Sequence, residues 1–332
     1  MRLLNVALAG FLAAGPVGMG ALTLPARAQT TTPSLSQRLN SGANAVKLSM
    51  EVACGKLEKS NCNQVLPRIA EQSMQTGLSL SPVESEGSME SASGVCAGAV
   101  PAAIVQRDAA DLRRRNADCV GRYEPVGKAL YPYYGYLVAA AASRYDSLSA
   151  LIDDTPQGKV RTVAAGAVGS GGQVTLGYML RANPEWKRTV NIANYSLDTA
   201  LQRITDGSVD AFFVMDGPGS DLIDQIRVAV DAKGKPLYKF LDVRPGKQFY
   251  ASRDWSGRNL YQEVVLEGGF FRSTKTVSVD ALMIVSNEFR ENRAKNGPRA
   301  VGLLAEAIDR AQAGVFADTK TPRDWVPAAA KK

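Results

Sequence analysis

Two short loops rich in glycine and serine are the parts of this sequence best suited to bind a ligand. They are Ser85-Glu86-Gly87-Ser88-Met89-Glu90 and Val168-Gly169-Ser170-Gly171-Gly172-Gln173. Each follows a predicted strand and opens a predicted helix, where free backbone N–H groups and the positive end of the helix dipole favour an anion. Small side chains let a ligand approach the backbone. Taken alone, either loop could equally be an ordinary turn in which Ser88 or Ser170 caps a helix.

The usual sets of catalytic residues do not assemble in this sequence. The chain has no histidine, which excludes His-based triads, imidazole bases and His-metal sites. Ser170 lacks the Gly-x-Ser-x-Gly elbow because Val168 stands at the first glycine position. Residues 121–129 differ from a P-loop in spacing and in lacking Ser or Thr after Lys128. The sequence does not exclude a catalytic pair of carboxylates among the 32 acidic residues. We nevertheless expect a binding protein and not an enzyme, with no cofactor and no metal.

Two α/β series follow one another along the chain and would position these loops. In the first, the residue patterns predict strands at 46–52, 78–83 and 102–105 and helices at 64–75 and 108–116. In the second, strands at 160–165, 190–193, 209–215 and 237–243 alternate with helices ending at 180, spanning 197–204 and covering 221–230. Strand, helix and strand in succession predict a parallel α/β sheet in each series.

The end of the chain is predicted to return to the first series. Residues 276–286 alternate as a long strand would, and a C-terminal helix has one apolar face formed by Leu304, Ala307, Ile308 and Ala311. A double crossover of this kind makes a hinge with a cleft between two lobes. The predicted fold class is therefore α/β with two lobes, each a mixed or parallel sheet flanked by helices. Lobe 1 would comprise residues 44–137 and 276–332, and lobe 2 residues 138–275.

The first residues are typical of an export signal. Arg2 precedes an apolar stretch from Leu3 to Leu24, and Pro25-Ala26-Arg27-Ala28 supplies small residues for cleavage before Gln29. The alternative is an uncleaved anchor, which glycines, a proline and Asn5 within the stretch disfavour. We expect a signal peptide at residues 1–28, a disordered leader rich in Thr, Ser, Pro and Gln at 29–43, and a periplasmic protein.

The charge of the chain indicates solubility and no nucleic-acid partner. The net charge of +7 falls to +5 when Arg2 and Arg27 leave with the signal. The one basic run, Arg113-Arg114-Arg115, is most simply a solvated helix face, because no aromatic residues or binding motif accompany it.

The four cysteines indicate disulfides, since their number is even and the chain is predicted to be exported. Three pairings exist, and short loops favour Cys54 with Cys62 and Cys96 with Cys119. Zinc is the competing interpretation, which the absence of both Cys-x-x-Cys and histidine disfavours.

Five stretches, in order, resemble the TAXI family of TRAP-transporter solute receptors, over roughly residues 45 to 310. Val83 to Ser91, leading to Ala103-Ile104-Val105-Gln106-Arg107-Asp108, resembles a Gly-Ser-x-Glu-Asn helix start followed by a strand ending in Gln-x-Asp. Residues 166–172 are similar to the family's Gly-x-x-Gly-Ser-Gly-Thr loop. The other stretches are residues 200–212, the turn Asp216-Gly217-Pro218 and the return strand at 276–282.

The chain also departs from that family in three places. The family's first loop, a glycine-rich turn with paired tyrosines, is replaced by the charged segment from Ala53 to Cys62, which would line the cleft. Gly172 stands where threonine is usual, and Ser91 stands where asparagine is usual. The identity of the ligand therefore does not carry over from the family.

The resemblance implies a type II-like periplasmic-binding-protein fold and a monomeric receptor that captures a small anionic solute, a carboxylate or an amino-acid-like molecule, for TRAP membrane transporter subunits. A sensor that serves a membrane kinase, or an exported hydrolase without histidine, is the alternative. Tyr133 and Tyr134 could wall the cleft or belong to the core, and Asp216 could receive an ammonium group or simply make a turn. The expected ligand contacts are Ser88, Gln106, Ser170, Gly171, Gly172, Gln173, Tyr133 and Asp216.

Overall fold

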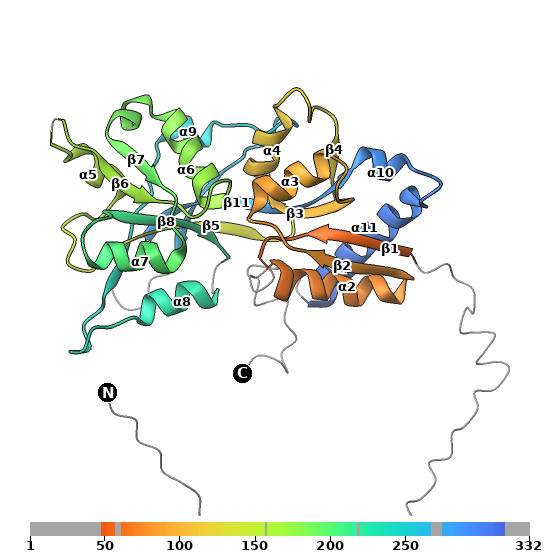
Figure 1. Ribbon diagram of the computed structural model, residues 1–332, viewed down its shortest axis with the longest axis horizontal. Helices are drawn as coiled ribbons and strands as arrows, with labels where there is room; N and C mark the ends of the chain where they lie inside the picture. Colours follow the sequence, from red (N-terminus) through yellow and green to blue (C-terminus); the bar gives the residue numbers. More distant parts are fainter. Residues whose placement is uncertain (1–47, 57–60, 157, 218–219, 267–273, 316–332) are drawn as a thin grey trace, which may run out of the picture. The chain divides into compact units, whose positions relative to one another are not determined.

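The computed structural model describes residues 48–56, 61–156, 158–217, 220–266 and 274–315 (Figure 1). They belong to one compact unit that begins at Val46. The predicted signal peptide and leader lie outside the described residues. Within these ranges, no helix has both the length and the apolar character needed to cross a bilayer.

Across the described residues, eleven strands form one continuous sheet. β11 (Thr274–Ser286) lies near its middle and pairs antiparallel with its neighbours on both sides, including β4 (Tyr123–Val126) and β10 (Gln262–Leu266). β9 (Tyr238–Leu241) pairs with β5. The main order is β2 (Leu78–Val83), β1 (Leu48–Ala53), β3 (Ala102–Gln106), β11, β5 (Pro132–Ala140), β8 (Ala211–Asp216), β6 (Arg161–Ala164) and β7 (Val190–Ala193).

Helices cover both faces of the first half of the sheet. We call this half of the sheet, together with its helices, lobe 1. Alternate residues of its parallel strands point to opposite faces, so Met50 and Ile104 pack with Leu304 of α11 (Gly297–Val315), while Ala103 packs with Val95 of α3 (Ser88–Cys96). α2 (Leu66–Gln75), which follows the π-helical turn η1 (Asn61–Val65), contacts α11, and α4 (Arg107–Arg114) lies beside α3. α10 (Asn287–Glu291) precedes α11.

The second half of the sheet, lobe 2, is layered in the same way. Leu176 and Met179 of α6 (Gly171–Ala182) pack on the face that holds Phe213, and α7 (Leu197–Thr205) and α8 (Asp221–Val228) pack on the face that holds Phe212. Figure 1 shows α6 on one side of this sheet and α7 and α8 on the other. The short elements are α5 (Leu148–Asp153), η2 (Pro184–Arg188) and α9 (Lys247–Tyr250). The α/β class and the two lobes are confirmed.

The chain passes between the lobes twice. β4 pairs with the second half of β11, whereas β5 pairs with the first half and with β8 and β9 of lobe 2. The predicted boundary after residue 137 therefore falls inside β5. We propose instead that the first crossover lies at residues 127–131 and the return near Asp280 in β11.

Both disulfides join cysteines that are close in sequence. Cys54 is bonded to Cys62 and Cys96 to Cys119, the local pairing that loop length favours. The first disulfide closes the loop after β1. The second ties the end of α3 to the turn after α4.

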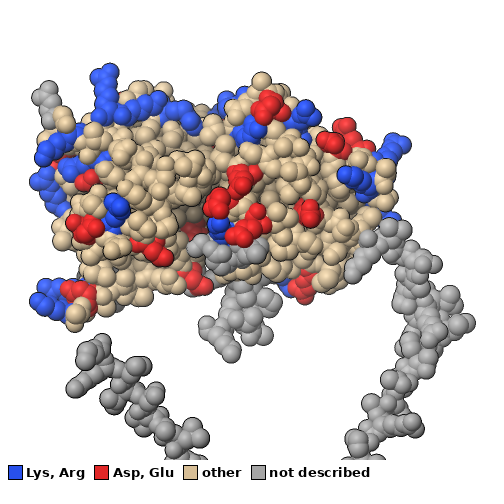
Figure 2. Space-filling view, in the orientation of Figure 1, with Lys and Arg blue, Asp and Glu red and all other residues tan. Residues whose placement is uncertain are grey.

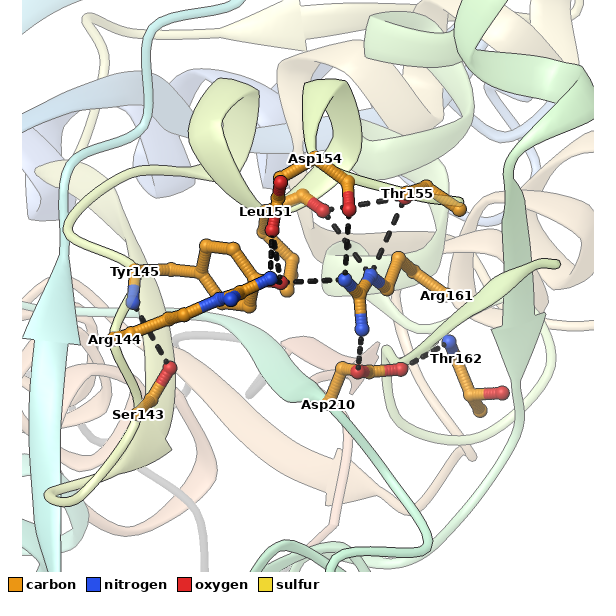
Figure 3. A network of polar contacts seen from close by, with 9 residues as sticks. All are labelled: Ser143, Arg144, Tyr145, Leu151, Asp154, Thr155, Arg161, Thr162 and Asp210. Atoms are coloured by element: carbon orange, nitrogen blue, oxygen red, sulfur yellow. Dashed lines mark hydrogen bonds and ion pairs between the residues drawn. The ribbon is translucent and has the colours of Figure 1, made fainter. Parts of the chain in front are cut away.

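A polar network holds the start of β6 (Figure 3). The Tyr145 hydroxyl accepts hydrogen bonds from Arg144 (3.0 Å) and Arg161 (2.5 Å) and donates one to Asp154 (2.9 Å). Arg161 also pairs with Asp210 at 3.0 Å. The network lies at the amino end of β6, opposite the Gly166 to Gly172 loop, so we assign it a role in stability.

Candidate functional site

A cavity of about 230 Å³ lies between the two glycine-rich loops. Its walls come from the carboxyl ends of β1, β3 and β8 and from the loops that follow β2 and β6. Ligands of open α/β sheets bind at this edge of the strands. Lobe 1 contributes Cys54, Gly55, Lys56, Asn61, Glu86, Gly87, Ser88, Ile104 and Gln106; lobe 2 contributes Tyr133, Ser170, Gly171, Val214, Met215, Asp216 and Leu222.

The two loops touch each other across the lobes. The Met89 N–H, in the first turn of α3, donates a hydrogen bond of 3.2 Å to the Gly169 carbonyl. A Cβ on Gly87 would lie 3.2 Å from the Ser170 Cα, and one on Gly169 would lie 3.0 Å from the Met89 Cβ. Glycine at both positions therefore allows the close approach of the two backbones.

Gln106 occupies the floor of the cavity at the end of β3. Its backbone N–H donates to the Ser88 hydroxyl at 3.1 Å, and its side chain packs directly on Gly171. The residue is 3% exposed, and its Oε1 has no hydrogen-bond partner among the described residues. Because a buried acceptor without a donor costs about 1–3 kcal/mol, this side chain is suited to receive an N–H or O–H from a ligand.

Ser170 acts as the N-cap of α6. Its hydroxyl donates to the Ala165 carbonyl (2.8 Å) and accepts from the Gln173 N–H (3.4 Å). The bond to Ala165 uses the hydroxyl's only proton. Toward a ligand, the Ser170 hydroxyl can therefore only accept a hydrogen bond. The N–H of Gly171 has no acceptor within the described ranges and lies at the positive end of the helix, where an anion is favoured.

Gly172 and Gln173, both expected as ligand contacts, lie outside the cavity lining. Gly172 packs against β8, and a Cβ there would be 2.8 Å from the Phe213 carbonyl oxygen. The Gln173 side chain accepts from the Gly169 N–H (2.6 Å) and donates to Asn194 (2.8 Å). Both residues shape the loop.

Tyr133 and Tyr134, which are neighbours in β5, point to opposite faces of the sheet. Tyr133 lines the cavity, is 7% exposed and packs on Tyr131 with 4.9 Å between ring centroids. The Tyr131 hydroxyl donates to Asn61 of the disulfide loop. Burial raises the pKa of both phenols, which keeps them neutral. Tyr134 packs with the core on the other face.

The cavity is acidic on balance, because Glu86 and Asp216 line it with Lys56. Lys56 Nζ lies 2.5 Å from Glu86 and 3.5 Å from Glu84, and the hydrogen bond to Glu86 raises the pKa of Lys56. The Asp216 carboxylate accepts from the Gly217 N–H at 2.7 Å. Figure 2 shows acidic side chains gathered near the middle of the face seen there and basic ones mainly towards its edges.

Sequence reasoning did not single out Lys56, Asn61 or Glu86 as contacts. For Lys56 and Asn61 the signal lay in the cysteines, because the Cys54–Cys62 bond holds both residues near the end of β1. Glu86 belongs to the first glycine-rich loop. The expectation that the segment lines the cleft agrees with the position of its described residues.

A larger hollow of about 890 Å³ lies at the far ends of α4 and α6. Its arginines already have partners in the protein. Arg115 pairs with buried Asp111 at 2.6 Å, and Arg253 donates to three backbone carbonyls at the end of α9. Arg181 stacks on Tyr178, with 4.0 Å to the ring centroid. We therefore take the smaller cavity as the candidate site.

The run Arg113-Arg114-Arg115 differs from the predicted solvated face. Arg113 pairs with Asp118 and Arg114 with Glu124, both at 2.6 Å, and both arginines are partly buried. Each of the three charges thus has its own carboxylate.

Comparisons with known proteins show similarity of structure only. No family model matches the chain, and no curated protein matches it. A putative L-cystine ABC transporter protein from Listeria monocytogenes is 12% identical, with a TM-score of 0.48 over 80% of this chain and 92% of that one. The periplasmic aliphatic sulphonate binding protein SsuA from Escherichia coli is 12% identical, with a TM-score of 0.43 over 80% and 75%. The OxyR regulatory domain from Pseudomonas aeruginosa is 11% identical, with a TM-score of 0.40 over 80% and 98%.

These similarities do not identify a ligand for this chain. Transporter binding proteins and a regulatory domain occur among them, and unrelated functions often share a fold. The resemblance to the TAXI family stays a prediction.

Proposed function

We propose that this chain is an exported solute-binding receptor that closes on a small amino-acid-like solute and does no chemistry on it. The observation that carries the proposal is the contact of two strand-end loops, one from each lobe, over a cavity lined by both lobes. The partner we propose, a TRAP-type membrane transporter, follows from the resemblance of the sequence.

The residues of the cavity favour a solute with charges of both signs. The Gly171 N–H at the start of α6 suits a carboxylate, and Lys56, which pairs with Glu86, adds a positive charge to the lining. Asp216 and Glu86 suit an ammonium group, and the Gln106 Oε1 needs a donor. A dicarboxylate would meet two acids and one lysine, so an amino acid fits the charges better. The cavity volume of about 230 Å³ is smaller than the roughly 300–1,000 Å³ of sites for drug-sized ligands. It suits a molecule of the size of an amino acid.

We propose that export removes residues 1–28 and delivers the protein to the periplasm. The apolar stretch and the Ala-x-Ala pattern before Gln29 support this. Mass spectrometry of the protein from its own source should give an amino terminus at Gln29. An intact Met1 in the exported protein would contradict cleavage.

A thermal-shift screen of the mature protein against amino acids, dicarboxylates, keto acids and sulfonates tests the receptor function. At a concentration of 100 times Kd, the solute should add about 2.7 kcal/mol to the free energy of unfolding. Gly171→Ala should remove this effect, because the added Cβ would lie 2.0–2.4 Å from the Gln106 side-chain amide and crowd the cavity.

Gly177→Ala is the matched control for that variant. It lies in the same helix, and its Cβ would have nothing within 4 Å, so solute binding should be unchanged. Catalytic turnover of a compound without stoichiometric binding would refute the receptor function.

A further inference from the structure

Helices α4 and α6, one from each lobe, are joined by two hydrogen bonds between side chains. The Thr175 hydroxyl donates to Asp108 at 2.6 Å, and the Tyr178 hydroxyl donates to Asp111 at 2.8 Å. The spacing is three residues on both helices, so each pair of side chains lies on one helix face. Both helices begin at the cavity, α4 directly after Gln106 and α6 at Gly171.

These bonds are shielded from water. Asp108, Asp111 and Thr175 are each 0% exposed. The Tyr261 hydroxyl donates a second bond to Asp108 at 2.9 Å, and Arg107 pairs with Asp254 at 2.9 Å. Hydrogen bonds to a charged group contribute about 1.5–3 kcal/mol each.

In each of the two α4–α6 bonds, the donor and the acceptor belong to different lobes. Arg107, Asp108 and Asp111 are on α4 of lobe 1, while Thr175 and Tyr178 are on α6 of lobe 2. Separating the lobes would break the α4–α6 bonds and bring water to the carboxylates. None of the four side chains in these two bonds lines the cavity.

We propose that the Asp108–Thr175 and Asp111–Tyr178 bonds form a latch that holds the two lobes closed. The four residues that make these bonds are positioning residues. They affect solute binding only by setting the fraction of molecules whose cavity is closed. The effect on solute affinity rests on the proposed function, whereas the effect on closure does not.

Hydrogen exchange of the solute-free protein tests the latch. The Met89 amide is a direct reporter, because its bond to Gly169 exists only while the lobes touch. Tyr178→Phe and Thr175→Val each remove one donor to the latch, and each should raise the Met89 exchange rate about tenfold. Amides of Ile104 in β3 and Val163 in β6, inside the separate lobes, should keep their wild-type rates.

Tyr238→Phe is the control, because the Tyr238 hydroxyl bonds to Leu201 and Thr205 within lobe 2. Its Met89 rate should match wild type. An unchanged Met89 rate in both latch variants overturns the proposal. A rate that rises equally at Met89, Ile104 and Val163 also overturns it, because that result means loss of general stability.

Calorimetry with the solute found by the thermal-shift screen extends the test. Where closure limits binding, the apparent Kd should rise in inverse proportion to the closed fraction that remains. If no solute binds, the proposed function fails while the exchange result still decides whether the latch exists. An unchanged Kd together with faster Met89 exchange would overturn the link between the latch and affinity.

Discussion

Gly171 and Gly172 are neighbours in sequence but meet different surroundings. Gly171 faces the Gln106 side chain at the cavity, whereas Gly172 packs on backbone atoms of lobe 2. A motif comparison treats both as ligand contacts, because it reads residue types and spacing alone. The path of the backbone decides that one is accessible to a ligand and the other is not.

Gly172→Ala should destabilise the protein by about 1–3 kcal/mol, as overpacking does. The added Cβ would lie 2.8 Å from the Phe213 oxygen and 3.0 Å from the Ala165 oxygen, and these backbone atoms cannot rotate away. Urea unfolding measures the loss. Gly177→Ala should be neutral or slightly stabilising, since helices favour alanine over glycine. Equal stabilities of the two variants would contradict this assignment.

At the scale of elements, strands with strong patterns were predicted best. β2 and β7 have the predicted bounds, and α4 and α7 differ from them by one or two residues. β4, β5, β10, α5, α9 and α10 were not predicted as strands or helices. Most of them are short, and β4 forms by pairing with β11, which is distant in sequence, a contact that no local pattern encodes. β10 pairs with β11 as its neighbour along the chain.

The two disulfides should differ in what their removal does. Replacing either pair with serine should lower the free energy of unfolding by about 2–4 kcal/mol, more for Cys96–Cys119 because it closes 23 residues and not 8. Only removal of Cys54–Cys62 should also weaken solute binding, because its loop lines the cavity. Calorimetry and urea unfolding check both effects. Loss of binding in the Cys96–Cys119 variant alone would contradict this division.

At the scale of the whole molecule, the buried contact between α4 and α6 makes stability depend on pH. Burial raises the pKa of Asp108 from 3.8 to about 6, although hydrogen bonds from Thr175 and Tyr261 favour its charged form. Burial also raises the pKa of Tyr178 and Tyr261, so these phenols stay neutral.

Asp108 should therefore make the folded protein more stable as the pH falls from 7 to 5. The folded state takes up its proton near pH 6 and the unfolded state only near pH 4, so the gain should reach about 1 kcal/mol at pH 5. The difference in unfolding free energy between wild type and Asp108→Asn, measured in urea at both pH values, isolates this residue. A difference that does not change with pH, or that changes with the opposite sign, would contradict the raised pKa.

The sequence by itself determined the class of the protein and the order of its parts. Hydrophobic periodicity depends on neighbours a few residues apart, so it predicted two α/β series, a returning strand and helix, and the two glycine-rich loops. The absence of histidine removed whole classes of catalytic site. Tertiary structure alone decided which side chains meet: Lys56 with Glu86, Gln106 on Gly171, and Asp108 with Thr175. Those contacts join residues 30 to 67 positions apart, and their energies depend on burial and distance, which only the folded chain fixes.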